Sequence, residues 1–321
     1  MPTRKFEKQE WPLFYLSGRV DGTAEEEKDW VERSGCDTRC FSYAFVSPDA
    51  FYATKRMVAS YEMSKKLKCR IMMDSSAHSF QQFARNGQLE RVEENRKKTL
   101  DGYIKFVERD SEQWDFYFNF DYRVHAPTVY KMQRFLEKQG LHPVPVFHGD
   151  DGMDWLRRYI DDGHKLVGIS VAPSIRGTWK GKRFYLDQVF DLTEKAGVQC
   201  HGLALTSLSI AFSYPFYSID STTWIRQAAF GSIAMVNPST HVMEYIHVSE
   251  RNCGTGRTSY NNMPQSVRKE IRRKVELAGF DFDKLRKDLK ERAIYTGYVF
   301  SHMSEMGITK GRGKIQWERL L

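Results

Sequence analysis

Three apolar segments of the chain end in an aspartate, and carboxylates placed in this way can act as nucleophiles or as general acids and bases. The three residues are Asp74, Asp121 and Asp220. If the segments are parallel strands of one sheet, the acids converge on one pocket, an arrangement kept chiefly for chemistry because grouped carboxylates repel one another. The alternative is that an aspartate caps the following helix, which the hydroxyl residues after Asp74 and Asp220 leave open.

Two kinds of chemistry fit acids at strand ends. A metal-dependent hydrolase would need a His-x-His pair on the first strand, and although His148 and His201 are available, residues 13–17 contain no histidine. Carboxylates alone suit glycosidic chemistry, in which one attacks the anomeric carbon and another acts as acid and base. We therefore expect Asp74 and Asp220 to be catalytic residues of a glycosidic reaction.

Short β-branched and aromatic segments alternate with helical patterns along the chain, which is typical of an α/β fold. The predicted strands are residues 13–17, 40–46, 69–74, 115–121, 143–148, 166–171, 198–205 and 216–220. The predicted helices are residues 24–33, a helix opened by Ser47-Pro48-Asp49, and residues 90–108, 127–139, 151–161, 186–196, 208–212 and 222–229.

Eight strand-then-helix units predict a (β/α)8 TIM barrel over residues 1–235, a fold of about 250 residues whose catalytic groups lie at the carboxyl ends of the strands. A doubly wound sheet is the alternative, but residues 17–22 lack the glycine-rich fingerprint that would follow its first strand. Residues 236–321 are expected to form a basic, mostly helical C-terminal extension. Its predicted elements are a strand at 242–248 and helices at 264–278 and 282–306.

Positive charge is concentrated near the end of the chain. From residue 251 onward there are 16 Lys and Arg against 8 Asp and Glu, which accounts for the whole net charge of +8. Such asymmetry predicts a surface that binds nucleic acid, with a merely well-solvated helical surface as the alternative. The residues expected to contact phosphates are Arg268, Lys269, Arg272, Arg273 and Lys274 in the extension, and Arg123, Arg176 and Lys180 after barrel strands.

The cysteines and the apolar pattern exclude several other classes of protein. Five cysteines at irregular spacing argue against a disulfide framework and favour a reducing compartment. Cys36 and Cys40 could share a metal, but no second close pair completes a four-ligand site, so no metal is expected. No apolar segment approaches the roughly 20 residues of a membrane helix, and the polar N-terminus lacks a signal-peptide core. We expect a cytoplasmic protein without membrane contact.

Several strand ends resemble those of tRNA-guanine transglycosylases. The segment Asp74-Ser75-Ser76-Ala77-His78 is similar to that family's Asp-Ser-Gly-Gly-aromatic segment. Residues 147–149 (Phe-His-Gly) resemble its Gln-Gly-Gly strand end, and residues 167–171 its Gly-Gly-Leu-Ala segment. Residues 201–205 followed by 218–221 resemble the stretch that carries its nucleophile. The resemblance covers residues 12 to 230 in order, in short motifs.

Two departures point to a particular branch of that superfamily. The family's Cys-x-Cys-x-x-Cys…His zinc site is absent, and Cys253 stands alone. Residues 217–224 (Tyr-Ser-Ile-Asp-Ser-Thr-Thr-Trp) instead resemble the branch that acts on DNA, several members of which are encoded by phages and so work in the host cytoplasm. Those DNA 7-deazaguanine transglycosylases exchange guanine for a 7-deazaguanine such as preQ0. The resemblance implies DNA and a free 7-deazaguanine base as partners, and no cofactor.

The resemblance also implies roles for the acids. Asp220 would attack C1′ of the target deoxyguanosine and expel guanine, and Asp74 would be the general acid and base. Two displacements in sequence leave the anomeric configuration unchanged. Asp121 would accept hydrogen bonds from N1–H and the 2-amino group of the base.

The remaining residues of the expected base site are Ser75, His78, His148, Gly149 and Gly168. His148 and Gly168 would contact the carbonyl edge and the 7-substituent, and His78 would stack on the base. Because duplex DNA hides C1′, the target nucleotide must be flipped out or single-stranded. The alternatives are a tRNA-guanine transglycosylase, a glycoside hydrolase with acids after strands four and seven, and a non-catalytic nucleic-acid-binding barrel.

Overall fold

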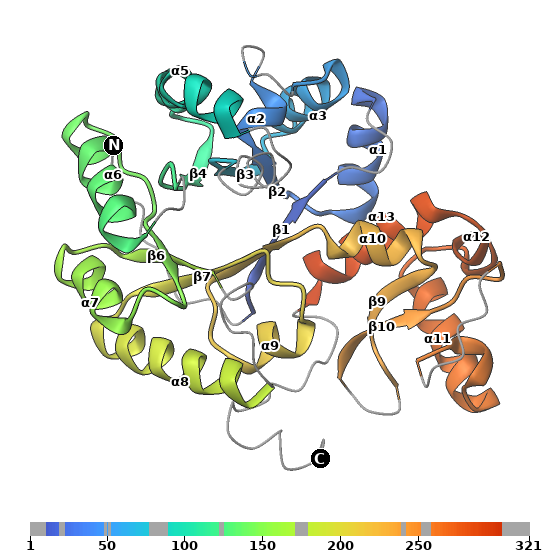
Figure 1. Ribbon diagram of the computed structural model, residues 1–321. Helices are drawn as coiled ribbons and strands as arrows, with labels where there is room; N and C mark the ends of the chain where they lie inside the picture. Colours follow the sequence, from blue (N-terminus) through green and yellow to red (C-terminus); the bar gives the residue numbers. More distant parts are fainter. Residues whose placement is uncertain are drawn as a thin grey trace.

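The computed structural model describes residues 11–18, 23–47, 50, 53–76, 89–121, 125–170, 179–238, 242–251 and 258–303, with the backbone alone at 89–97 and 179–180. Its centre is a curled sheet surrounded by helices, and a smaller group of elements from the C-terminal part lies beside it (Figure 1). No helix within these residues is both long and apolar enough to cross a membrane.

Eight parallel strands form the sheet, in the order β4-β3-β2-β1-β8-β7-β6-β5. The strands are β1 Leu13–Ser17, β2 Thr38–Ser42, β3 Arg70–Asp74, β4 Trp114–Tyr117, β5 Val146–His148, β6 Leu166–Ser170, β7 Gln199–Leu203 and β8 Ser218–Ser221. The first strand pairs with the last, with Tyr15 opposite Asp220. The prediction of eight parallel strands, each near its expected place, is confirmed.

The two edge strands approach each other at one point. Phe118, directly after β4, forms a parallel bridge with Val144, just before β5. The Val144 amide donates to the Tyr117 carbonyl at 2.8 Å, and the Asn119 amide donates to the Val144 carbonyl at 2.9 Å. The carboxyl ends of β4 and β5 are therefore brought together although the sheet order places these strands at opposite edges.

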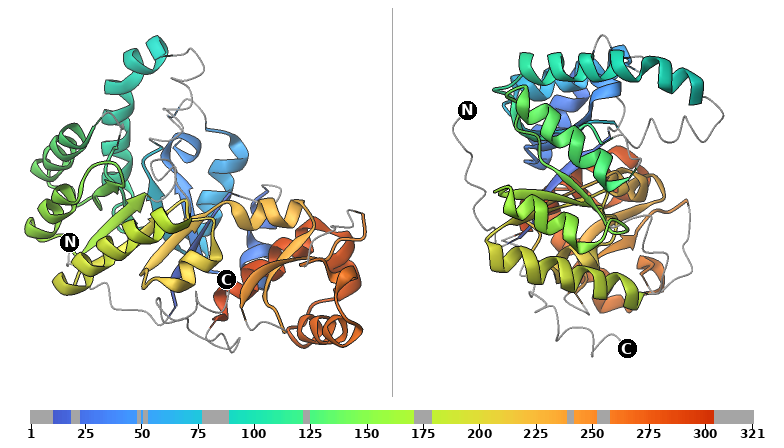
Figure 2. Two further views of the ribbon diagram at one scale, coloured as in Figure 1. Left: turned by 60° about the horizontal axis from the view of Figure 1, so that its bottom comes forward. Right: turned by 60° about the vertical axis from the view of Figure 1, so that its left-hand side comes forward.

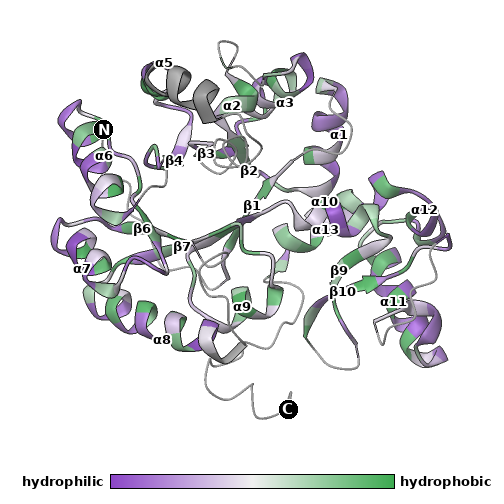
Figure 3. Cartoon of the chain, viewed as in Figure 1, coloured by the Kyte–Doolittle hydropathy of each residue, from purple (hydrophilic) through white to green (hydrophobic). Residues whose placement is uncertain are grey.

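Helices cover the outer face of the sheet (Figure 2). They are α1 Ala24–Ser34, α2 Tyr43–Val46, α3 Lys55–Lys66, α5 Leu89–Arg109, α6 Ala126–Lys138, α7 Met153–Asp161, α8 Trp179–Ala196, α9 Leu208–Ser213 and α10 Thr223–Ala229. Local sequence explains several of their starts, such as the reciprocal capping box between Thr23 and Glu26 at α1. Their sides facing the sheet are hydrophobic and their outer sides hydrophilic (Figure 3).

Two sequence-based boundaries in the first part are wrong. The predicted strand 40–46 ends at Ser42, and residues 43–46 form the helical turn α2 instead. The helix expected to open at residues 47–49 begins at Lys55, where the Thr54 hydroxyl accepts a hydrogen bond from the Met57 amide. Apolar and aromatic residues favour a strand locally, so only packing distinguishes the buried turn from a continued strand.

The inside of the curled sheet holds its own layer of buried side chains, including Tyr15, Met72, Phe116, Phe118 and Tyr217. Below this layer, at the amino ends of the strands, the Arg70 guanidinium contacts Asp115 at 2.7 Å, and the Tyr15 hydroxyl donates to the same carboxylate. These side chains fill the space inside the curled sheet near the amino ends of its strands.

The C-terminal elements pack against the sheet and its helices. They are the antiparallel pair β9 Ser232–Val236 and β10 Met243–His247, the 3-10 turn η2 Tyr260–Asn262, and the helices α11 Gln265–Leu277, α12 Phe282–Lys287 and α13 Leu289–Ser301. The boundary expected after residue 235 thus falls inside β9. The single helix expected at 282–306 is two helices, because Asp288 breaks the pattern and accepts a hydrogen bond from the Lys290 amide at 2.8 Å.

Helix α13 is buried on most sides and ties the extension to the first strand and helix. The Phe300 ring stacks on the Phe14 ring with centroids 4.2 Å apart. A side chain at Gly297 would place its first carbon 2.8 Å from the Trp30 ring, so only glycine allows this close approach. The extension is therefore part of the same hydrophobic core as the sheet.

Candidate active site

Asp74 and Asp220 lie at the carboxyl ends of β3 and β8, with β2 and β1 between these strands. Ser42 is opposite Asp74 in one strand pair, and Ser17 is the last residue of β1. Both serine hydroxyls contact the acids, Ser42 with Asp74 at 2.9 Å and Ser17 with Asp220 at 3.5 Å. The structure therefore brings the two predicted catalytic acids to one end of the sheet.

The surroundings of Asp74 make its carboxyl group easier to protonate than a solvent-exposed carboxyl group. Burial, together with repulsion from Asp220 and Asp121, raises the pKa of Asp74 to about 6, although hydrogen bonds from the Ser42 hydroxyl and the Ser76 amide act in the opposite direction. The charges of Asp220 and Asp121 therefore both act on Asp74. A carboxyl group that titrates near pH 6 can both give and take a proton.

Ser76 holds this end of β3 in an unusual backbone conformation. Its φ is 71°, in the left-handed region that favours glycine. Its hydroxyl accepts from the Ala44 amide at 2.8 Å and contacts the Ser42 hydroxyl at 2.6 Å, while its amide donates to Asp74 at 2.9 Å. The strained residue thus connects the start of α2 to the Asp74 carboxylate.

One carboxylate oxygen of Asp220 is held by two hydrogen bonds. Its Oδ1 accepts from the Ala204 amide at 2.8 Å and from His201 Nε2 at 3.2 Å. Helix α10 does not use this carboxylate as a cap, because the Ser221 hydroxyl, not Asp220, accepts a hydrogen bond from the Thr223 amide, at 3.0 Å. The capping alternative is therefore wrong for Asp220, whose Oδ2 is left with the long contact to Ser17.

His201, which the sequence suggested only as a possible metal ligand, lies at the site. It is fully buried in β7, opposite Ser218 in the strand pairing. Its Nδ1 lies 2.8 Å from the Ser218 hydroxyl while its Nε2 faces Asp220, so the hydrogen on Nε2 points to the carboxylate and the serine donates to Nδ1. The only sequence signal for this contact is that the two residues lie on neighbouring strands.

Asp121 and His148 form a second buried pair, at the ends of the two edge strands. His148 Nε2 lies 2.5 Å from Asp121 Oδ2. His148 is 7% exposed and Asp121 is 5% exposed. Within the described residues, Asp121 Oδ1 and His148 Nδ1 are buried without any hydrogen-bond partner. Leaving a buried polar atom unsatisfied costs about 1–3 kcal/mol, which marks these two atoms as the place where a polar ligand would bind.

The other predicted base-site residues have different positions. Ser75 is buried beside Asp74, and Gly149 lies in the turn after β5. Gly168 is opposite Val146, two pairs before the pair of His148 and Ser170, and the Phe118 ring would lie 2.7 Å from a side-chain carbon there. Packing thus gives Gly168 a structural reason to be glycine. His78 lies outside the described residues.

The predicted phosphate contacts of the extension lie on α11, where acids neutralise part of the charge. Arg272 contacts Asp283 at 2.5 Å, and Arg273 contacts Glu270 at 2.8 Å. Lys269 and Lys274 lie on the same helix, together with Arg268, whose Nε is buried without a partner in the described part. Arg123, Arg176 and the side chain of Lys180 fall outside the described residues.

The cysteines and acids were also considered as metal ligands. Cys36, Cys40, Cys69 and Cys200 are buried free thiols. Over the described residues, no three histidine, cysteine or acidic side chains are grouped so that they could hold a metal ion.

Comparison with protein-family models and with curated protein sequences finds no match. Among solved structures, the chain is similar to one described as a mandelate racemase/muconate lactonizing protein from Herpetosiphon aurantiacus, with a TM-score of 0.40 and 12% identity. The similarity covers 66% of this chain and 55% of that chain, so it spans little more than half of that protein. A likeness this distant carries no argument about function.

Proposed function

We propose that the protein is a DNA-guanine transglycosylase, a pentosyltransferase that replaces guanine in DNA by a 7-deazaguanine such as preQ0 or a derivative. The observation that carries the proposal is the pair of acids in contrasting environments. Asp220 accepts hydrogen bonds from His201 and the Ala204 amide, whereas burial and repulsion raise the pKa of Asp74 to about 6. Such a division suits a nucleophile beside an acid–base group.

The reaction follows from the free positions around these acids. Asp220 Oδ2, whose one contact among the described residues is with Ser17 at 3.5 Å, forms a bond to C1′ as the bond from C1′ to N9 of guanine breaks. The electron pair goes to the departing base, which takes a proton from Asp74. The Asp74 carboxylate then accepts the N9 proton of the incoming 7-deazaguanine, whose N9 attacks C1′ and releases Asp220.

Asp121 and His148 would bind the base. Asp121 Oδ1 can accept hydrogen bonds from N1–H and the 2-amino group that guanine and 7-deazaguanines share. The vacant His148 Nδ1 would face the carbonyl edge or the 7-substituent. The link between Asp121 and His148 lets one residue orient the other when a base enters.

We further propose that the sheet is a closed (β/α)8 barrel and that DNA is the polynucleotide. The bridge from Phe118 to Val144 supports closure. The resemblance of residues 217–224 supports DNA over tRNA. Incubation with guanine-labelled DNA or tRNA and a candidate 7-deazaguanine tests the substrate; we expect release of label from DNA, and release from tRNA alone would refute the proposal.

Asp121→Asn should lower the catalytic efficiency for base exchange by about 10²-fold or more, because an amide places a donor where the base also donates. The measurement is kcat/KM for incorporation of the 7-deazaguanine into DNA. Asp154→Asn on α7 removes an exposed carboxylate and should leave it unchanged. Equal efficiency of the Asp121 variant and the wild type would exclude a role in reading the base.

His201→Phe should lower kcat about 10- to 100-fold with little change in KM, because Asp220 loses the donor that orients it. His201→Gln, whose amide can approach the place of Nε2, should recover part of the rate. Circular dichroism would confirm that both variants are folded. If the two variants have the same kcat, or if KM alone changes, His201 is not a positioning residue.

A further inference from the structure

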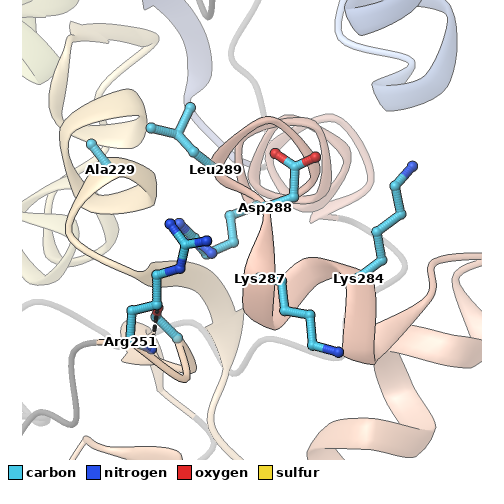
Figure 4. A pocket seen from close by; sticks show the side chains of 8 residues that line it. Ala229, Arg251, Lys284, Lys287, Asp288 and Leu289 are labelled. Atoms are coloured by element: carbon cyan, nitrogen blue, oxygen red, sulfur yellow. Dashed lines mark hydrogen bonds between the residues drawn. The ribbon is translucent and has the colours of Figure 1, made fainter.

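A cavity of about 660 Å³ lies in the C-terminal part of the molecule, apart from the aspartates. Its walls come from the end of α10, the segment after β10 and the junction of α12 with α13 (Figure 4). The charged residues that line it are Arg251, Lys284, Lys287, Asp288 and Arg292. Four of these five side chains are basic, so the cavity is strongly electropositive.

Arg292 places a buried charge at the wall of this cavity. The residue is 5% exposed, and its guanidinium donates to the main-chain carbonyls of Ala228 at 2.7 Å and Leu285 at 3.0 Å. It forms no ion pair with a carboxylate of the described residues. Burial lowers the pKa of Arg292, the charge of Asp288 acts in the opposite direction, and the charge of Arg251 lowers the pKa further. A buried charge that no carboxylate contacts directly is costly, so an anion bound here would stabilise it.

The other basic residues differ in whether an acid already neutralises them. Lys284 lies 2.6 Å from Glu291. Arg251 and Lys287 are exposed, and neither forms an ion pair with an acid in the described residues. Asp288, the acid of the cavity, is engaged as the cap of α13. Two exposed cations and one buried cation are therefore available to the same space.

We propose that this cavity binds a phosphate group. Guanidinium and ammonium groups are the side chains that bind phosphate best, and α13, a helix of 13 residues, begins at Leu289 on the cavity wall, where its dipole also favours an anion. The cavity lies at the end of α10 opposite to Asp220, so it is separate from the site of base exchange. The phosphate would belong either to the polynucleotide backbone, which rests on the proposed function, or to a small phosphorylated molecule.

The double variant Arg251→Gln/Lys287→Gln tests the proposal and keeps Arg292, which joins the ends of α10 and α12. The control Lys66→Gln/Lys138→Gln removes two exposed charges from α3 and α6. Inorganic phosphate should raise the melting temperature of the wild type and the control but not of the cavity variant. The double variant should bind single-stranded DNA about tenfold more weakly than the wild type. The slope of its plot of log affinity against log salt concentration should be smaller in magnitude by about 1.4, the value for two lost phosphate contacts.

The two measurements distinguish the source of the phosphate. Weaker DNA binding assigns the cavity to the polynucleotide backbone. Loss of stabilisation by inorganic phosphate with unchanged DNA binding assigns it to a small phosphorylated ligand. The proposal is overturned if the cavity variant equals the control in both assays. Neither assay requires base exchange, so a protein that shows both effects but exchanges no base would refute only the transglycosylase.

Discussion

Asp220→Asn should abolish base exchange, with a fall in rate of about 10⁴-fold or more, because an amide oxygen cannot replace the carboxylate as nucleophile. The variant should remain folded, since the asparagine oxygen can still accept the hydrogen bond that the Ala204 amide gives to Asp220 at 2.8 Å. The measurement is single-turnover release of labelled guanine from DNA, together with thermal unfolding.

A matched control for this variant is Asp191→Asn. Asp191 is exposed on α8 and pairs with Lys195 at 2.8 Å. We expect its exchange rate to stay within about twofold of the wild type, as for most surface changes. A folded Asp220 variant that exchanges guanine at the control rate would show that Asp220 is not the nucleophile.

Asp74→Asn should lower the exchange rate by about 10²- to 10⁴-fold, the usual contribution of a general acid–base group. Its mechanism is visible in the pH dependence, because burial and repulsion raise the pKa of Asp74 to about 6. Guanine release needs the protonated acid, so this step should slow as the pH rises above about 6. Attack by the incoming base needs the carboxylate, so that step should slow as the pH falls below about 6.

These opposite limbs can be measured separately by single-turnover release and by chasing a preformed intermediate. The Asp74→Asn variant should lose both limbs, whereas the profile of the Asp191→Asn control should keep its shape. If both half-reactions of the wild type have the same pH dependence, Asp74 does not serve as acid in one step and base in the other.

The raised pKa of Asp74 also predicts a cost in stability. Because the folded pKa of about 6 lies above that of an unfolded aspartate, its contribution to stability is complete only below the unfolded value and is lost as the pH rises through about 6. At pH 8, the free energy of unfolding of Asp74→Asn should therefore exceed that of the wild type by on the order of 1–2 kcal/mol. The difference is no larger because part of the Asp74 carboxyl faces solvent, which screens its charge. The difference should vanish near pH 4.

The sequence predicts the sheet and the acids because both depend on local pattern. The segment of β1 is a short continuous apolar run, and α1 is opened by a capping box; their predicted and observed bounds nearly agree. Asp74 and Asp220 stand where apolar strands end, which is enough to place them at one face once the strands are parallel.

Features that depend on three-dimensional contacts could not be predicted. The pair Asp121–His148 joins the ends of strands that are adjacent only through the bridge at Phe118. The bond from His201 to Asp220 depends on strand pairing between β7 and β8. On α11, the charge count predicts a polyanion surface, but ion pairs such as Arg272–Asp283 occupy part of it. Charge alone does not reveal which cations are already neutralised.

The most direct test of the central claim is to trap the covalent intermediate. The protein is incubated with DNA in the absence of an incoming base, denatured, digested and analysed by mass spectrometry. We predict an adduct between the sugar and the peptide that contains Asp220, which disappears when a 7-deazaguanine is added before denaturation. Guanine release without any adduct at Asp220, or an adduct at another residue, would contradict the account.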